Sequence, residues 1–324
     1  MIQQNLTAAI AAFAIVAGLA PLGIPLLRRM KAGQSIREEG PKAHQKKAGT
    51  PTMGGLIMIP AVVAVTLWFS GAAKEALLAL FLFLGYALVG LADDALKVVF
   101  KRNLGLTARQ KLLGQFIIAI IYFSFSDAKL HQLWLPWSGQ SMEIGAVAGA
   151  IFSFLVMVGT TNAVNLTDGL DGLAAGVTVI TASVYAYIAA DAAHPELAFF
   201  AIAVAGACAG FLLFNAHPAK VFMGDTGSLA LGGALAALAM ETRTELLLVV
   251  IGGIYVAEAL SVILQVISFQ TTGKRIFLMS PLHHHFELKG WNEWKVVLVF
   301  WSVSAGFGLL ALLIWHISKI GVNG

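Results

Sequence analysis

Residues 216–232, AHPAKVFMGDTGSLALG, place His217, Lys220 and Asp225 between two strongly apolar segments. A charge near hydrocarbon costs about 3 kcal/mol or more unless it has a partner, so ionisable residues at a membrane edge indicate function. Asp225 also precedes the apolar run that begins at Ser228, where an aspartate can cap the backbone N–H groups of a helix. Helix capping and ligand binding are both open for Asp225, and other parts of the chain must decide between them.

The composition around this stretch is typical of a polytopic membrane protein. Of the 324 residues, 58% are hydrophobic and 12% are charged, whereas soluble domains carry about 25% charged residues. The first apolar run has no Lys or Arg before it and no convincing cleavage site, so we expect a retained helix and not a signal peptide. The single cysteine, Cys208, excludes an intramolecular disulfide, and the net charge of +4 does not indicate a nucleic-acid partner.

Ten apolar segments approach the length of about 20 residues that a helix needs to cross a bilayer. We therefore predict an all-α polytopic integral membrane protein with about ten transmembrane helices, in which residues 1–324 form a single transmembrane domain. The segment 228–240 is too short to span about 30 Å at 1.5 Å per residue, so it should begin within the membrane edge. The ten segments are 6–27, 53–69, 76–100, 111–125, 144–162, 173–190, 197–214, 228–240, 246–269 and 296–317.

The basic residues predict the orientation of these helices. If the loop 28–47 is cytoplasmic, alternation places four further polar loops on the same side, namely 97–111, 165–171, 215–226 and 270–295. These five regions hold all of the 21 Lys and Arg residues except Lys74, Lys129, Arg243 and Lys319. Because cytoplasmic loops carry an excess of Lys and Arg, both termini are expected on the outer side. Residues 126–143 are the one substantial outer loop and indicate an interfacial hairpin.

Two of the cytoplasmic loops combine lysines with capping residues or carboxylates. In KAGTPTMGG (47–55), Thr50 and Pro51 are typical of an N-cap and a first helical residue, beside a lysine that favours anion binding. Capping alone also explains this pair. Asp93 and Asp94 end an apolar run and share a helical face with Lys97. A salt-bridged helix end is the simpler alternative, but a single aspartate would serve that purpose.

The other polar clusters carry amides, acids and histidines. NLTDGLDG (165–172) can hydrogen-bond a nucleobase, ribose or sugar, although its Asx and Gly residues also make good turns. His283, His284 and His285 are poor ligands for one zinc because neighbouring side chains point apart. We expect them to form a face that binds phosphate or sugar, with an ordinary surface loop as the alternative. Glu258 is an intramembrane acid that could be a buried partner, line a groove or mark a transport path.

Five loops that converge on one membrane face, with carboxylates and lysines, favour an enzyme that joins a phosphorylated soluble substrate to a lipid. Carboxylates and phosphate oxygens are ligands that Mg²⁺ prefers. The motifs KAGTPTMGG, LADDALK, NLTDGLDGL, NAHPAKVFMGDTGSLALGG and PLHHHFELKGW together resemble the phospho-N-acetylmuramoyl-pentapeptide transferases, within the polyprenyl-phosphate N-acetylhexosamine-1-phosphate transferase superfamily. The resemblance covers nearly the whole chain. PLHHHFE and KAGTPTMGG point to the muramoyl-pentapeptide branch, whereas the double aspartate and MGDTGS are shared more widely.

The resemblance implies transfer of phospho-MurNAc-pentapeptide from UDP-MurNAc-pentapeptide to undecaprenyl phosphate, with Mg²⁺ as cofactor, giving lipid I and UMP. It also implies a homodimer in the bacterial cytoplasmic membrane. Asp225 is then expected to bind Mg²⁺ and to be catalytic together with Asp93 and Asp94. The expected substrate-binding residues are Lys47, Thr52, Lys97, Lys111, Asn165, Asp168, Asp171, His283, His284 and His285.

The chemistry favours direct in-line attack by the lipid phosphate. Its second pKa is about 6, so most of it is a dianion at pH 7, and the barrier is repulsion between two anionic groups. Asp93 would take any residual proton or position the lipid phosphate, and Asp94 would support the metal and lysine network. A covalent route through Asp94 or Asp225 is the alternative. A sister transferase for UDP-GlcNAc is the rival enzyme, and a secondary transporter is the rival class, disfavoured because the charges gather at one face.

Overall fold

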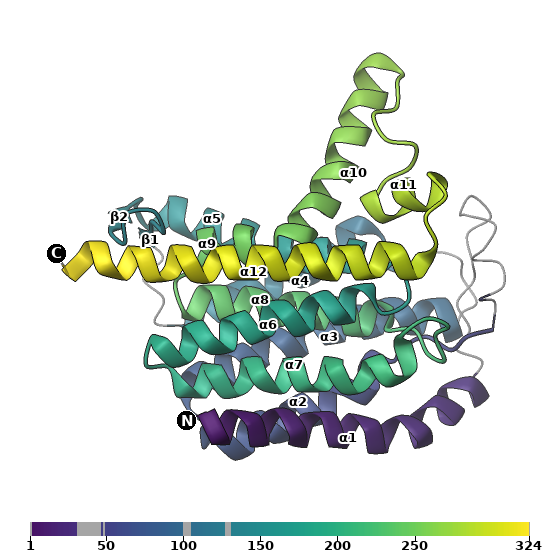
Figure 1. The fold of residues 1–324 in the computed structure, drawn as a ribbon, viewed down its shortest axis with the longest axis horizontal. Helices are drawn as coiled ribbons and strands as arrows, with labels where there is room; N and C mark the ends of the chain where they lie inside the picture. The colour runs from purple at the N-terminus through teal and green to yellow at the C-terminus, as the bar shows by residue number, and fades with distance from the viewer. Residues whose placement is uncertain (1, 31–46, 48, 100–104, 127–130, 324) are drawn as a thin grey trace.

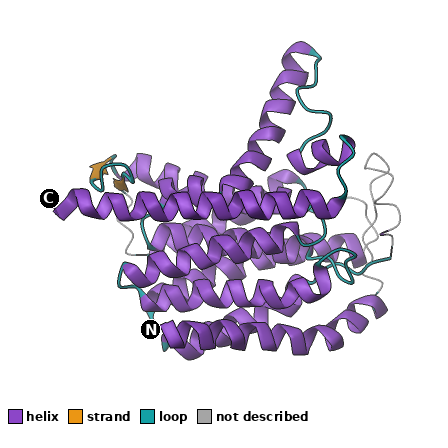
Figure 2. Ribbon diagram, viewed as in Figure 1, coloured by secondary structure: helices purple, strands orange, loops and turns teal. Residues whose placement is uncertain are grey.

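The computed structural model describes residues 2–30, 47, 49–99, 105–126 and 131–323, and most of these residues are helical (Figures 1 and 2). The elements are α1 (Ile2–Arg29), α2 (Gly55–Ser70), α3 (Lys74–Val99), α4 (Ala108–Phe125), β1 (Gln132–Trp134), β2 (Ser141–Glu143), α5 (Ala146–Thr167), α6 (Leu173–Asp191), α7 (Pro195–Asn215), α8 (Gly224–Glu241), α9 (Glu245–Ile251), α10 (Gly253–Thr272), α11 (Leu282–Leu288) and α12 (Glu293–Asn323). Parts of the predicted basic loops 28–47 and 97–111, together with Lys129, lie outside the described residues.

The prediction of an all-α integral membrane protein is confirmed in its coarse form. Within the described chain, seven helices are long and apolar enough to cross a membrane, and these are α1, α3, α5, α6, α7, α10 and α12. The helix α2 is apolar but shorter. Each of the ten predicted segments coincides with helical structure, although the count of ten crossings stays a prediction.

The ninth predicted segment, 246–269, is not one helix. It is interrupted at Gly252, where α9 ends and α10 begins. Glycine is about 1 kcal/mol less favourable than alanine inside a helix, so it is a natural place for an interruption. Figure 1 shows that α10 leans away from the bundle and that α11 lies beside α10. The helix α11 lies within 270–295, a region that the sequence predicted as a loop.

The helix α8 is the centre of the bundle. All of its residues from Thr226 to Met240 are buried, and it packs against α3 and α5. Its run of glycine, alanine and leucine suits this place, because small residues let helix backbones approach closely inside a membrane. The helix begins at Gly224, four residues before the predicted start at Ser228, so Asp225 lies in its first turn and not ahead of it. The fold thus buries one helix and brings its polar beginning to one end of the bundle.

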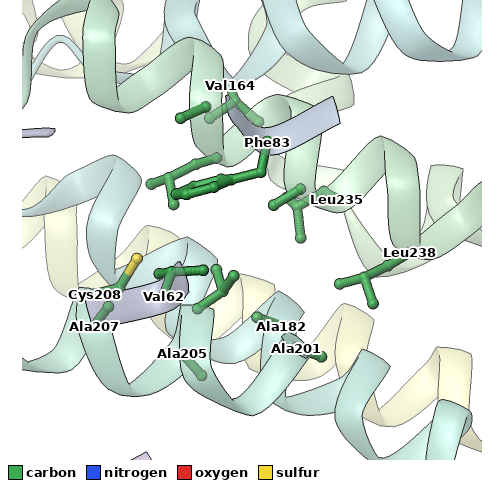
Figure 3. Packing of buried hydrophobic residues seen from close by; sticks show 14 of the residues in the cluster. Val62, Phe83, Val164, Ala182, Ala201, Ala205, Ala207, Cys208, Leu235 and Leu238 are labelled. Carbon is green, nitrogen blue, oxygen red and sulfur yellow. The ribbon is translucent and has the colours of Figure 1, made fainter. Parts of the chain in front are cut away.

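Buried hydrophobic side chains from several helices fill the space around α8 (Figure 3). Phe83 of α3 lies near Leu235 of α8 in this view, and Cys208 of α7 joins the same cluster. Cys208 is completely buried, which agrees with its expected place in an apolar segment. The cluster holds the helices that carry the site residues in fixed relative positions.

The predicted hairpin in residues 126–143 is present as β1 and β2. The two strands are antiparallel, with Leu133 opposite Met142. The ring of Trp134 lies 5.5 Å from that of Trp315 in α12, measured between centroids, so the hairpin is attached to the last helix.

The close packing of α8 on α3 makes a testable prediction at Gly233. A Cβ atom there would lie 2.6 Å from the ring of Tyr86 and 2.9 Å from the carbonyl oxygen of Leu82. Gly233→Val should therefore destabilise the fold by about 1–3 kcal/mol through overpacking, measured as a lower melting temperature in detergent. Gly159→Val in α5 is the control, because nothing lies within 4 Å of that position. Equal losses in the two variants would contradict the packing argument.

Candidate active site

The carboxylate of Asp94 joins the end of α3 to the beginning of α8. It accepts hydrogen bonds from the backbone N–H of Asp225 at 3.2 Å and from the backbone N–H and hydroxyl of Thr226 at 2.9 and 2.7 Å. The N-cap residue of α8, Met223, makes no side-chain capping hydrogen bond. Asp94 therefore supplies the cap from another helix, where a negative charge is favoured by the free N–H groups and the helix dipole. Capping by Asp225 itself, which the sequence left open, is not seen.

Asp225 points into a group of donors from three other segments. Its Oδ2 atom lies 2.6 Å from Nζ of Lys111 and 3.3 Å from Nζ of Lys97. Its Oδ1 atom accepts a hydrogen bond of 3.1 Å from the amide of Asn165, which also donates to the Ser228 hydroxyl at 2.8 Å. The carboxylate is thus held from both sides by α3, α4 and the end of α5.

Asp93 shares both lysines with Asp225. Its two oxygens lie 2.5 Å from Nζ of Lys97 and 3.1 Å from Nζ of Lys111, and it accepts the backbone N–H of Leu106 at 2.7 Å. Both Asp93 and Asp94 are buried, so their charges are poorly screened by water. The helical neighbour Lys97 is a real partner of Asp93, as the spacing predicted, but the pair belongs to a larger network.

The three aspartates suit a divalent cation. Each of Asp93, Asp94 and Asp225 offers a carboxylate oxygen, and these atoms lie within 4.8 Å of one another. Three carboxylates against two lysines leave one negative charge in excess, and hard oxygen donors are what Mg²⁺ prefers. This donor set fits the expected metal, with phosphate oxygens and water left to complete its coordination.

A second polar cluster is built around Lys47. Its Nζ atom lies 2.8 Å from Oδ1 of Asp171 and 2.6 Å from Oε1 of Glu293. Nδ1 of His217 lies 2.9 and 3.1 Å from the other oxygens of the same two acids. Asp171, His217 and Glu293 also have the spacing of a metal site. We interpret the cluster as an ion-pair network, because Lys47 pairs with both carboxylates and His217 contacts their remaining oxygens.

Glu293 is the member of this cluster that sequence reasoning missed. It lies in the first turn of α12 and also accepts the backbone N–H of Asp171 at 2.7 Å. Its signal in the sequence was an acid near the end of the polar loop 270–295, shortly before the last apolar segment, and that signal is common to many helix N-termini.

Residues 51–54 lie beside the loop that precedes α8. The backbone N–H of Phe222 donates to the carbonyl of Pro51, and that of Gly54 donates to the carbonyl of Phe222, both at 2.8 Å. Thr52 is buried between them. The prediction that Thr50 and Pro51 begin the second helix is wrong, since α2 begins at Gly55 without a side-chain cap. The carbonyl of Pro51 is used in this tertiary pairing instead.

Asp168 lies in the turn between the two clusters. Burial raises its pKa to about 8, and the nearby charges of Asp225, Asp94 and Asp171 act in the same direction. The raised pKa favours the protonated carboxyl group, and in that form it can donate a hydrogen bond to a ligand.

The three consecutive histidines differ in their burial and in their partners. His283 is completely buried, with Nδ1 3.1 Å from Oε1 of Glu258. His284 pairs with Glu287 at 2.8 Å. His285 accepts the backbone N–H of Leu278 at 3.1 Å through Nδ1. The rings of His283 and His284 are nevertheless in contact, with centroids 4.2 Å apart, and His284 and His285 are only partly buried.

Comparisons with known proteins cover nearly the whole chain. The family model Glycosyl transferase family 4 matches residues 76–243, and the phospho-N-acetylmuramoyl-pentapeptide-transferase signature 1 matches residues 47–59. A phospho-N-acetylmuramoyl-pentapeptide-transferase from Geobacillus thermodenitrificans is 54% identical over 97% of this chain and 99% of its own length. Proteins with the same name from Anoxybacillus flavithermus and Bacillus subtilis are 54% and 53% identical, over 94% and 93% of this chain and 95% of each relative.

The cap formed by Asp94 makes a testable prediction. Asp94→Asn leaves one amide oxygen and adds a donor that faces the N–H groups of Asp225 and Thr226, so at least one buried donor loses its acceptor. That loss costs about 1–3 kcal/mol, and we expect a lower melting temperature in detergent. Thr226→Val removes only the hydroxyl donor and should cost less. An unchanged melting temperature in Asp94→Asn would show that the cap does not stabilise α8.

Proposed function

Because the chain belongs to the phospho-N-acetylmuramoyl-pentapeptide transferase family, we propose that it transfers phospho-MurNAc-pentapeptide from UDP-MurNAc-pentapeptide to undecaprenyl phosphate. The products are lipid I and UMP, in the first membrane step of peptidoglycan synthesis. The observation that carries this proposal is the grouping of Asp93, Asp94 and Asp225 with Lys97 and Lys111. A reaction between two anionic phosphates requires nearby positive charge. In this group, the acids hold two lysines in fixed positions.

The two lysines have the central electrostatic role in this proposal. Lys97 and Lys111 each lie between Asp93 and Asp225, so their ammonium groups are held without any substrate present. Preorganised charges stabilise a transition state without the cost of reorganising during the reaction. In the complex, the ammonium groups would contact the phosphates of the nucleotide and of the lipid from these positions. Asp93 would position them and accept any residual proton from the lipid phosphate.

Asp225 is the proposed principal ligand of Mg²⁺, with Asp93 and Asp94 nearby. When bound, Mg²⁺ would screen the negative charge of the pyrophosphate and favour the departure of UMP. Each carboxylate oxygen of Asp225 contacts a side-chain donor: Oδ2 contacts Lys111 and Oδ1 contacts Asn165. Either contact can be exchanged for a metal ion without breaking the backbone structure of α8.

The hydrogen bonds of Asp94 support direct transfer over a covalent intermediate. Its two oxygens accept three hydrogen bonds from the beginning of α8. A carboxylate engaged in this way is a weaker nucleophile, and its reaction would break the cap. We therefore propose in-line attack by the lipid phosphate on the β-phosphate of the UDP-linked substrate, the phosphate attached to the sugar.

The remaining polar residues are proposed to bind the soluble substrate. The turn 165–172 supplies Asn165, Asp168 and Asp171, and the neighbouring segments supply Lys47 and Thr52. His284 and His285 lie on α11 and are partly accessible, so they are available for the sugar or the peptide.

We further propose that ten helical segments cross the membrane, with the active-site loops in the cytoplasm and both termini outside. Figure 1 supports a common side for the termini, because both lie at the same end of the bundle. The domain would comprise residues 1–324 and would form a homodimer in the bacterial cytoplasmic membrane, as the family resemblance implies.

The metal assignment is tested by Asp225→Asn. This change removes one negative charge from the carboxylate cluster, and UMP release should fall on the order of 100-fold or more. The assay contains detergent-solubilised protein, UDP-MurNAc-pentapeptide, a polyprenyl phosphate and Mg²⁺. The melting temperature should stay close to that of the unchanged protein, since the cap on α8 is kept. Turnover near the original rate at low Mg²⁺ would rule out this role.

UDP-GlcNAc in the same assay tests the sister reaction, and preference for it would overturn the substrate assignment.

The direct mechanism makes a separate prediction about isotope exchange. Rigorously delipidated protein, incubated with UDP-MurNAc-pentapeptide and labelled UMP, should not transfer label into the UDP-linked substrate. A covalent enzyme intermediate would permit this exchange without any lipid acceptor. Adding polyprenyl phosphate is the positive control. Reproducible exchange in its absence would replace direct attack by the two-step route.

A further inference from the structure

A buried acid and a buried histidine lie outside the two clusters described above. Glu258 is in α10 and His283 is in α11, and both side chains are completely buried. Oε1 of Glu258 lies 3.1 Å from Nδ1 of His283 and accepts the backbone N–H of the same residue at 3.3 Å. Removing two ionisable groups from water is costly, so such a pair persists only where good geometry repays the cost.

The double contact fixes both the helix and the ring. One carboxylate oxygen holds the main chain of His283 and its imidazole, so the beginning of α11 and the side-chain rotamer are set together. α11 has only seven residues and would not be stable alone. Glu258 thus attaches this short helix to α10, the helix that leans away from the bundle (Figure 1).

The other edge of the same imidazole lies against the turn 165–172. A Cβ atom at Gly169 would lie 2.2 Å from Nε2 and 2.7 Å from Cε1 of His283. Real Cβ atoms do not approach other atoms so closely, so only glycine admits the ring at this place. Gly169 follows Asp168 directly and precedes Asp171 by two residues. The ring therefore sits on the backbone between two proposed substrate-binding acids.

We infer that Glu258 is a positioning residue for the transfer reaction: it holds the His283 ring against Gly169 and thereby sets the turn that carries Asp168 and Asp171. His283 then contributes through this contact and not by touching the substrate. The inference rests on the proposed function of the turn, because Asp168 and Asp171 matter to the reaction only if they bind the soluble substrate.

The connection continues to the Lys47 cluster. Asp171 is joined to Lys47 through its side chain and to Glu293 through its backbone N–H. A shift of the turn would therefore displace the partners that hold Lys47 as well. Misplacement of binding groups by about 1 Å can cost on the order of 100-fold in rate, so a buried residue that touches no substrate can still control the reaction.

The kinetic test compares changes at Glu258. Glu258→Ala should raise KM for UDP-MurNAc-pentapeptide about 10-fold or more, with KM for the polyprenyl phosphate unchanged, because the turn binds only the soluble substrate. Glu258→Gln keeps an oxygen acceptor and the side-chain volume, so it should recover most of the loss. Ser261→Ala is the matched control, since Ser261 is buried in the same helix and its hydroxyl donates to the backbone carbonyl of Glu258. Loss of kcat alone, equal for both substrates, would overturn the inference.

The contact with Gly169 gives a second, reciprocal test. Gly169→Ala should displace the imidazole and raise the same KM. In the double variant with Glu258→Ala the effects should not multiply, because both changes break the same contact. Independent, multiplicative effects would show that Glu258 does not act through the His283 ring.

A distance measurement tests the positioning without relying on activity. The single native cysteine, Cys208, is buried, so Lys220→Cys and Lys289→Cys, both at exposed positions, can carry a pair of spin labels. The distribution of label distances should broaden or shift in Glu258→Ala and stay narrow in Glu258→Gln and Ser261→Ala. An unchanged distribution in Glu258→Ala would overturn the inference even if KM changed. If Asp225→Asn remained active while this distribution broadened, the proposed active site would fail and the positioning by Glu258 would stand.

Discussion

The hydrogen bonds between Asp94 and the beginning of α8 are the contact on which the rest of the active site depends. They set the distance between α3 and α8, and this places Asp225 beside Asp93 and beside the two lysines. The arrangement also satisfies backbone N–H groups that lie in an apolar environment. A central helix of small apolar residues has unpaired N–H groups at its beginning, and a buried carboxylate from a neighbouring helix satisfies them at the place where negative charge is also needed for the metal.

In both polar clusters, each lysine is shared by two acids. Lys97 and Lys111 are shared by two aspartates, and Lys47 is shared by Asp171 and Glu293. Shared lysines compensate charge without filling every coordination position of the acids. A substrate phosphate or a cation can then replace one partner while the other keeps the side chain in place. This property distinguishes a prepared site from a closed structural ion pair, in which both partners would be lost together.

The sequence predicted the helices and the convergence of the acids for physical reasons. Apolar segments long enough to cross a membrane can be recognised directly in the sequence. The alternation of loops then places Asp93, Asp94 and Asp225 on one side before any contact is known. What the sequence could not show were contacts between distant segments. The carbonyl of Pro51 pairs with Phe222, which overturned a local helix-cap prediction, and Glu293 looked like an ordinary first-turn acid. Local patterns are reliable only where tertiary structure does not compete for the same groups.

Glu258 shows how such a long-range contact changes the meaning of a single residue. As an acid within an apolar segment, it left open a buried partner, a groove or a transport path. In the structure, its Oε1 atom is bound to the ring and backbone of His283, and its side chain has no exposure. A group on a transport path must meet water or a passing ion, which full burial in this conformation does not provide. The buried acid instead connects α10 with α11 and, through the His283 ring, contacts the turn next to Gly169, which is far away in the sequence. An intramembrane carboxylate can therefore serve a reaction at the membrane surface without contacting the reacting groups.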